Sequence, residues 1–194
     1  MWLPLPELPR AALALIIWVA VTGGLHDDAW MDTLDAAFAP VPAERRLEIL
    51  EDPHVGAHAV TGAVLLQIAR FAALAAVPAA ALPVATVVGR TAMAVSLGLA
   101  PPARPEGLGA TLSEGARPLP AIAVAAAILA VTAWLWRPLH VPLAVAAGGA
   151  AAAVWGLFLA RRFGGLTGDG HGSLGVLAEL AALWAFVPAD LRLA

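Results

Sequence analysis

The chain has 194 residues, of which 61% are hydrophobic and only 13% are charged. Because soluble domains carry charges on about a quarter of their residues, this composition argues against a soluble enzyme. The net charge of −3 gives no basic excess for binding nucleic acid, and the absence of cysteine excludes disulfides, thiolate metal sites and a cysteine nucleophile.

Six apolar stretches follow one another along the chain, and a helix needs about 20 such residues to cross a bilayer. The first covers residues 11–25. Residues 55–100 contain two more, which Pro78 and Pro83 divide into a helical hairpin. The last three stretches are residues 119–136, 139–160 and 173–188. The sequence therefore predicts an all-α, polytopic membrane helical bundle of six transmembrane helices, in which residues 1–194 form a single integral membrane domain.

Three polar connecting segments fall on one side of the membrane if the chain alternates sides through six helices. They cover residues 26–54, 101–118 and 161–172. Arginine is enriched on this side, and the side with more arginine faces the cytoplasm. The sequence therefore predicts a multi-pass protein of the cell (inner) membrane, with its polar chemistry in cytosolic loops. Arg45, Arg46, Arg104, Arg117, Arg161 and Arg162 lie in these loops, against Arg10, Arg137 and Arg192 on the opposite side.

Acidic side chains concentrate in the first of these loops. Eight lie between residues 27 and 52, against two arginines, which leaves this stretch at −6. Asp28, Asp32 and Asp35 have i, i+4, i+7 spacing, which places them on one stripe of a helix, where like charges repel. Mg²⁺ typically binds through one or two carboxylates and the phosphates of a substrate. The stripe therefore predicts a metal-dependent phosphate site, and the alternative is an acidic helix exposed to solvent.

The same spacing recurs in Glu44, Glu48 and Glu51. Here the alternative is stronger, because the neighbouring Arg45 and Arg46 offer ordinary surface pairing.

Residues 161–172 combine two adjacent arginines with five glycines and Asp169. Glycine lets backbone N–H groups approach an anion closely, and arginine binds phosphate through two parallel hydrogen bonds. The segment therefore predicts a phosphate-binding loop. The alternative is a glycine-rich turn between helices, with arginines that anchor the topology.

Five blocks of residues, spread over most of the chain, recur in the same order in one known family. They are residues 22–26 with Asp28, Asp32, Thr33 and Asp35; residues 46–49 with Asp52, Val55 and Gly56; Gly89 and Arg90; residues 103–109; and residues 161–169. The first block is similar to the motif TGGLHxDGLADTADG, the second to RLEIMKDSRIG and the last to RRLGGxTGD. In these blocks the chain resembles cobalamin synthase, the adenosylcobinamide-GDP ribazoletransferase family.

The chain departs from the family pattern at a few positions. Ala29 and Ala36 stand where the family motif has glycine, and Glu51, Pro53 and His54 replace a Lys-Ser-Arg triplet. The chain begins roughly at the family's second span, so the resemblance implies a member that is short at its N-terminus.

The resemblance also implies a reaction and a cofactor. A hydroxyl of α-ribazole, or of its 5′-phosphate, attacks the cobinamide-side phosphorus of adenosylcobinamide-GDP. The products are adenosylcobalamin, or its phosphate, and GMP, in the last steps of cobalamin biosynthesis. Mg²⁺ is the family cofactor. Phosphoryl transfer relies mainly on positioning and charge neutralisation, which suits a site of carboxylates and arginines.

The matching positions give candidate roles to individual residues. One of the candidate catalytic residues would accept the proton of the attacking hydroxyl, and Asp169 would reach the metal from a second segment. The candidate metal ligands are Asp28, Asp32, Asp35 and Asp52, the candidate catalytic residues are Asp35, His26 and Asp169, and the candidate substrate-binding residues are Arg90, Arg104, Arg161, Arg162 and Glu48.

Ionisable residues inside the apolar stretches need partners, because an isolated charge in a membrane is costly. We expect Arg90 to point inward, toward phosphate or an acid, and Glu179 to pair with an intramembrane arginine. Arg70 is expected to snorkel toward the membrane surface.

Other functions are compatible with the sequence. A CDP-alcohol phosphotransferase also uses several aspartates at a membrane face, but its continuous DGxxAR motif is absent. A small permease, or an inactive membrane partner of an assembly, is a non-enzymatic alternative, although a carrier places ionisable groups near the middle of the bilayer. The expected partners are adenosylcobinamide-GDP, α-ribazole and membrane lipid, with a second copy of the chain or a cobalamin-pathway assembly as candidate protein partners, and no nucleic acid.

Overall fold

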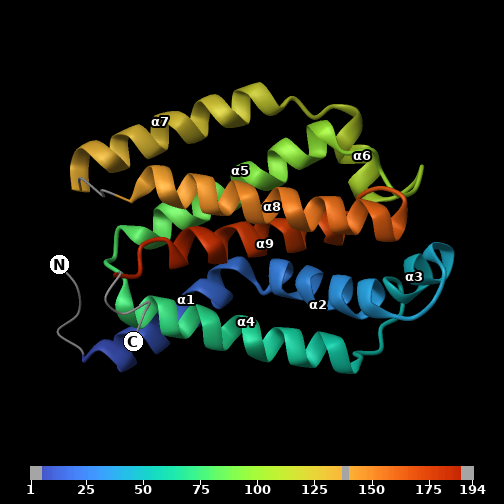
Figure 1. Cartoon of the computed structure of the whole chain (residues 1–194), viewed down its shortest axis with the longest axis horizontal. Helices are drawn as coiled ribbons and strands as arrows, with labels where there is room; N and C mark the ends of the chain where they lie inside the picture. The colour runs from blue at the N-terminus through green and yellow to red at the C-terminus, as the bar shows by residue number, and fades with distance from the viewer. Residues whose placement is uncertain (1–5, 137–139, 189–194) are drawn as a thin grey trace.

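The computed structural model describes residues 6–136 and 140–188. These residues form nine α-helices and no β-strand, which confirms the all-α prediction, and the long helices run side by side in a bundle (Figure 1). In chain order the helices are α1 (Glu7–Thr22), α2 (Leu25–Phe38), α3 (Ala43–Ile49), α4 (Ala57–Ala76), α5 (Ala81–Leu99), α6 (Leu108–Glu114), α7 (Pro118–Trp136), α8 (Val141–Phe163) and α9 (Gly168–Trp184).

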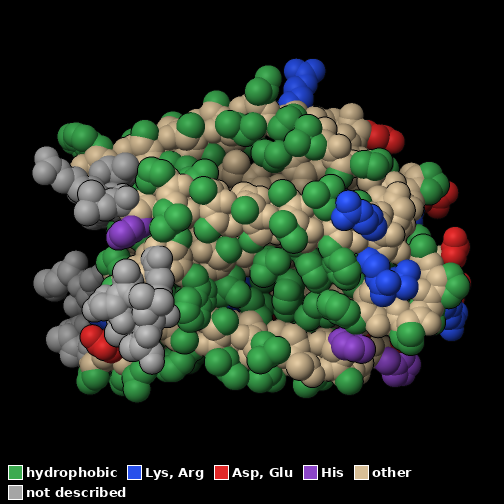
Figure 2. Space-filling model, viewed as in Figure 1, with side chains coloured by type: hydrophobic (Ala, Val, Ile, Leu, Met, Phe, Trp, Pro, Cys, Tyr) green, Lys and Arg blue, Asp and Glu red, His purple; other side chains and the backbone are tan. Residues whose placement is uncertain are grey.

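Several helices are suited to a membrane. Within the described ranges, α4, α5 and α8 are long and apolar enough to cross one, and α1 and α2 pass this test only as a pair bent by 86°. α7 is apolar over Pro118–Thr132. Hydrophobic side chains cover much of the visible side of the bundle, while most charged side chains in this view gather at the end where α3 lies (Figure 2). These features support a multi-pass membrane protein with three spans, or four if the bent pair is one span.

The polar connecting segments meet at one end of the bundle, around α3 and α6 (Figure 1). Arg46 Nη1 donates a hydrogen bond to the backbone carbonyl of Arg162 (3.2 Å), which joins the first segment to the third. Arg104 Nη2 donates to the carbonyl of Leu47 (2.9 Å), which joins the second to the first. The fold therefore brings together the three segments that the sequence places on one side of the membrane. Arg137 and Arg192, expected on the opposite side, lie outside the described residues.

α9 lies in the middle of the bundle, where it packs against α2, α4, α5 and α8. Most of its residues are buried, and glycines bring the neighbouring backbones close. A Cβ at Gly89 of α5 would lie 2.8 Å from the carbonyl oxygen of Gly175, and one at Gly148 of α8 would lie 2.8 Å from that of Ala178. Polar groups on α9 are therefore enclosed by other helices.

α2 enters the bundle between α4 and α9. Gly23 and Gly24 have φ values of 63° and 70°, a left-handed conformation that glycine adopts without strain and that turns the chain sharply after α1. The contact with α9 is close, because a Cβ at Gly172 would lie 2.7 Å from the Cβ of Ala29. The three aspartates thus lie on a helix, as their spacing predicts, and that helix is held against α9.

Candidate active site

Asp28 and Asp32 on α2 lie near Asp169 in the first turn of α9. α2 has 14 residues and α9 has 17, and Asp28, Asp32 and Asp169 all lie in the polar segments that the sequence places outside the apolar stretches. Burial, together with the charges of Asp28, Asp169 and Asp35, raises the pKa of Asp32 to about 6. Burial and Asp28 also raise the pKa of Asp169, although its backbone hydrogen bond and Arg104 oppose this shift. The carboxylates therefore repel one another, and a bound cation would stabilise them.

This donor set fits Mg²⁺, which prefers carboxylate oxygens. Within residues 6–136 and 140–188, no three His, Asp or Glu side chains converge closely enough to enclose a metal on their own. An enclosed protein cage is not required, since Mg²⁺ usually keeps waters and takes substrate phosphates as further ligands. Asp28 is exposed and Asp32 is partly buried, so the cluster is open to a ligand.

Asp35 has a different environment from the rest of the stripe. Its two carboxylate oxygens accept hydrogen bonds from the backbone N–H groups of Gly56 (2.6 Å) and Ala59 (2.9 Å), which are unpaired donors at the start of α4. A Cβ at Gly56 would lie 2.6 Å from Asp35 Oδ1, so glycine is needed for this contact. The contacts make Asp35 a cap of α4, and they do not support the predicted metal-binding and base roles.

Asp35→Ala is expected to lower the free energy of unfolding by about 1–2 kcal/mol, as loss of a helix cap does, and to leave the Mg²⁺ requirement within about twofold of wild type. Thermal unfolding of the purified protein and Mg²⁺ titration of its activity measure the two effects. An alanine variant of unchanged stability that needs far more Mg²⁺ would show instead that Asp35 is a ligand.

Two of the arginines near the cluster hold helix ends. Arg162 Nε and Nη2 both donate to the carbonyl of Ala37 at the end of α2 (2.9 and 2.6 Å), and Arg46 Nε donates to the carbonyl of Ala39 (3.3 Å). These are carbonyls that the helix itself leaves unpaired. The predicted phosphate-binding role of Arg162 is therefore not supported by its contacts. Arg161 is exposed in the last turn of α8.

Arg104 lies within electrostatic reach of Asp169. It pairs with Glu51 and lowers the pKa of Asp169, so its charge acts on the cluster. This position supports the predicted binding of a substrate phosphate.

The carboxylates of Glu48 and Asp52 pair with neighbouring residues of their own loop. Glu48 forms an exposed ion pair with Arg45. Asp52 is exposed and accepts a hydrogen bond from the backbone N–H of His54 (3.0 Å), and the backbone and side-chain hydrogen bonds of His54 lower the pKa of Asp52. The structure does not bring these two carboxylates to Asp32 and Asp169, and their predicted roles gain no support.

The glycine-rich run 161–172 is the third loop, and it packs against the second loop. Gly164 has a φ of 79° and ends α8, while Gly165 lets the backbone of residues 101–103 approach. A Cβ at Gly165 would lie 2.7 Å from the carbonyl oxygen of Pro101, which instead accepts a hydrogen bond from the N–H of Leu166 (2.9 Å). Thr167 caps α9 by accepting a hydrogen bond from the N–H of Gly170 (3.0 Å). These contacts fix the start of α9, and with it Asp169.

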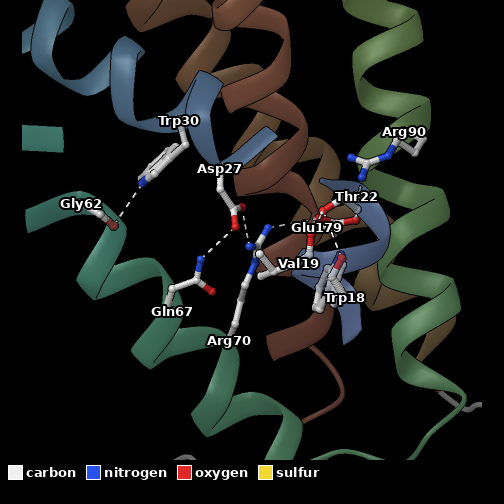
Figure 3. A network of polar contacts seen from close by, with 10 residues as sticks. All are labelled: Trp18, Val19, Thr22, Asp27, Trp30, Gly62, Gln67, Arg70, Arg90 and Glu179. Carbon is white, nitrogen blue, oxygen red and sulfur yellow. Dashed lines mark hydrogen bonds and ion pairs between the residues drawn. The ribbon is translucent and has the colours of Figure 1, made fainter. Parts of the chain in front are cut away.

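The buried Arg70 and the partly buried Asp27 form an ion pair that the sequence does not predict (Figure 3). Arg70 is only 2% exposed, so the prediction that it snorkels is wrong. The predicted pairing of Glu179 is confirmed, since Glu179 lies 3.5 Å from Arg70 and 3.8 Å from Arg90. The inward direction of Arg90 is confirmed by the same contact. The sequence does carry a signal for the buried side of α4, because Gln67 and Arg70 are two polar residues three positions apart on an otherwise apolar helix.

His26 lies in the first turn of α2, and its Nδ1 is buried with no hydrogen-bond partner among the described residues. Burial lowers the pKa of His26, and Arg90 lowers it further. The imidazole is therefore neutral near pH 7.

Comparisons with known proteins identify the family. The sequence profile of the family described as "Cobalamin-5-phosphate synthase" matches residues 1–187. Adenosylcobinamide-GDP ribazoletransferase of Deinococcus radiodurans is 39% identical over 191 residues, which cover 95% of this chain and 68% of the relative. The proteins of the same name from Brevibacillus brevis and Stutzerimonas stutzeri are 34% and 37% identical, each over 91% of this chain and 74% and 73% of the relative. No solved structure matches the chain.

The similarity thus extends over nearly the whole chain and is not limited to short motifs. It includes both helices that carry the carboxylate cluster and all three loops at that end of the bundle. It favours the enzyme over a CDP-alcohol phosphotransferase or a permease. The resemblance seen in the sequence blocks is confirmed, and the chain belongs to the cobalamin-5-phosphate synthase family.

Proposed function

We propose that this transferase of cobalamin biosynthesis joins adenosylcobinamide-GDP to α-ribazole, or to its 5′-phosphate, in a Mg²⁺-dependent reaction that releases GMP. The observation that carries the proposal is the group of mutually repelling carboxylates Asp28, Asp32 and Asp169 at the end of the bundle where the loops meet. Family membership supplies the two substrates.

The reaction exchanges one phosphorus–oxygen bond for another. A ribazole hydroxyl oxygen bonds to the cobinamide-side phosphorus, the bond from that phosphorus to the GMP oxygen breaks, and GMP leaves. Asp28, Asp32 and Asp169 would hold Mg²⁺ together with waters and phosphate oxygens of the substrate. When bound, this ion neutralises charge on the phosphate oxygens.

His26 accepts the proton of the attacking hydroxyl. Its support is the unpaired Nδ1 and the neutral state that burial and Arg90 favour. A neutral imidazole is the usual general base near neutral pH.

Arginines bind the phosphates of the substrate. The charge of Arg104 acts on Asp169, and Arg161 is exposed at the same end of the bundle. Arg90 is held by Glu179 but is a third exposed along its side chain, so it has donors left for a phosphate.

The membrane arrangement is part of the proposal. The proposed arrangement has six spans, one for each apolar stretch of the sequence, of which α4, α5 and α8 are long enough by themselves. In this arrangement the loop end of the bundle, with the site, lies at the cytosolic face of the cell (inner) membrane. A groove of about 730 Å³, lined mostly by apolar side chains of α5, α7 and α8, contains none of the carboxylates and suits lipid chains.

The proposal is tested by incubating membranes that contain the chain with adenosylcobinamide-GDP, α-ribazole and Mg²⁺. We expect GMP and the cobalamin product in equal amounts, loss of both with a chelator, and recovery on adding Mg²⁺. Absence of product from this chain, when the Deinococcus radiodurans relative forms it under the same conditions, would overturn the proposal.

A further inference from the structure

We infer that the buried ion network of Asp27, Arg70 and Glu179 is a positioning device, which sets the rotation of α2 and thereby holds Asp28 and Asp32 toward Asp169. The inference rests on the proposed function, since it assigns the network to the metal-binding carboxylates. It concerns residues that do not themselves touch the substrate.

The network ties α2 to α4 (Figure 3). The carboxylate of Asp27 accepts a hydrogen bond from Arg70 Nη1 (2.6 Å) and another from Gln67 Nε2 (2.9 Å). One turn later, Trp30 Nε1 donates to the carbonyl of Gly62 (3.1 Å). Two side chains on the same face of α2 are therefore fixed to α4.

The network continues from α4 into α9 and α5. Arg70 Nη2 lies 3.5 Å from one oxygen of Glu179, and Arg90 Nη2 lies 3.8 Å from the other. The guanidinium of Arg70 also lies over the ring of Trp18 of α1, 4.7 Å from its centre. Two acids and two arginines thus connect four helices with no excess charge, and a fifth helix covers them.

The burial of these groups makes the arrangement hard to change. Arg70 is 2% exposed and Glu179 is fully buried. Removing one member of a buried ion pair leaves an uncompensated charge, which is strongly unfavourable. Arginine also presents its donors in a rigid planar fork, so the contact specifies direction as well as distance.

The rotation of α2 is what this contact specifies. Successive residues of a helix are about 100° apart, so Asp27 and Asp28 point in clearly different directions. With Asp27 fixed toward Arg70, Asp28 and Asp32, one turn apart, are turned toward the side where Asp169 lies. Outer groups that orient metal ligands commonly change metal affinity by about 10- to 100-fold when they are mutated.

The test measures Mn²⁺ binding, by electron paramagnetic resonance of the free ion, to purified full-length protein without substrates. We compare wild type, Arg70→Gln and the charge-balanced double variant Arg70→Gln with Glu179→Gln, and record thermal unfolding for each. Thr132→Val is the control, because it removes a buried hydroxyl on α7 that donates a hydrogen bond to the carbonyl of Ile128 in the same helix.

We expect both network variants to bind Mn²⁺ about 10- to 100-fold more weakly than wild type. The double variant should recover stability relative to Arg70→Gln, because its charges balance, without recovering Mn²⁺ affinity. A merely structural role would change unfolding alone, so a folded network variant that binds Mn²⁺ like wild type overturns the inference. If Arg70→Gln does not fold, Asp27→Asn, which keeps the shape of the side chain, serves in its place.

Asp32→Asn separates this result from a failure of the proposed function. If Asp32→Asn weakens Mn²⁺ binding and the network variants do not, the metal site stands and only the positioning role is lost. If Asp32→Asn binds Mn²⁺ like wild type, the proposed metal site is wrong and the inference falls with it.

Discussion

Asp32→Asn is expected to reduce kcat/KM for Mg²⁺-dependent transfer by at least about 10³-fold, which corresponds to about 4 kcal/mol of transition-state stabilisation. Asp32 is the carboxylate on which the charges of Asp28, Asp169 and Asp35 all act. Asparagine keeps its shape and removes a charge that repels these neighbours, so the variant should fold at least as stably as the metal-free wild type. Product formation at saturating Mg²⁺ measures the loss.

The matched controls are Glu48→Gln and Asp52→Asn, which make the same change at exposed carboxylates paired with Arg45 and His54. Both should keep activity close to wild type. Full activity in Asp32→Asn, or an equal loss in a control, would remove the assignment of Asp32 to the metal.

His26→Gln is expected to lower kcat by about 10²- to 10⁴-fold, the range over which general bases contribute. Glutamine is polar and fills a similar space, but it cannot accept the proton of the ribazole hydroxyl. Mn²⁺ affinity should stay unchanged, because the histidine is not assigned to the metal. Single-turnover measurements with saturating substrates isolate this step from substrate binding.

His58→Gln is the control for this change, since His58 is an exposed histidine stacked on Phe38. It should leave kcat as it is. An unchanged kcat in His26→Gln would mean that another group receives the proton.

Much of the helix pattern could be predicted from the sequence, because each apolar stretch ends at prolines, glycines or charges. The apolar stretch over residues 139–160 corresponds to α8, and the division near Pro78 separates α4 from α5. The bend of 86° between α1 and α2 could not be predicted in the same way. It depends on positive φ values at Gly23 and Gly24, and glycine permits that conformation without requiring it.

The direction of Arg70 was predicted wrongly for a physical reason. α4 is apolar on nearly all sides, so its sequence carries little information about which face meets other helices and which meets lipid. A lone arginine on such a helix is equally compatible with snorkelling and with a buried pair. Only the tertiary contacts with Asp27 and Glu179 decide between them.

In the candidate site, too, the sequence predicts which residues share a helix but does not predict their contacts with other helices. Spacing correctly placed Asp28, Asp32 and Asp35 on one helix, but it could not show that the start of α4 provides two N–H groups to Asp35. That contact joins residues 21 and 24 positions apart, and it depends on how α2 and α4 pack.

The contact between Ala29 and Gly172 sets a shared limit on side-chain volume. Ala29 occupies a position where the family motif has glycine, and its methyl group already fills the space that a side chain at residue 172 would need. The packing of α2 against α9 therefore limits the combined size of residues 29 and 172. With this backbone only one of the two residues can carry a Cβ, and in this chain it is residue 29 on α2.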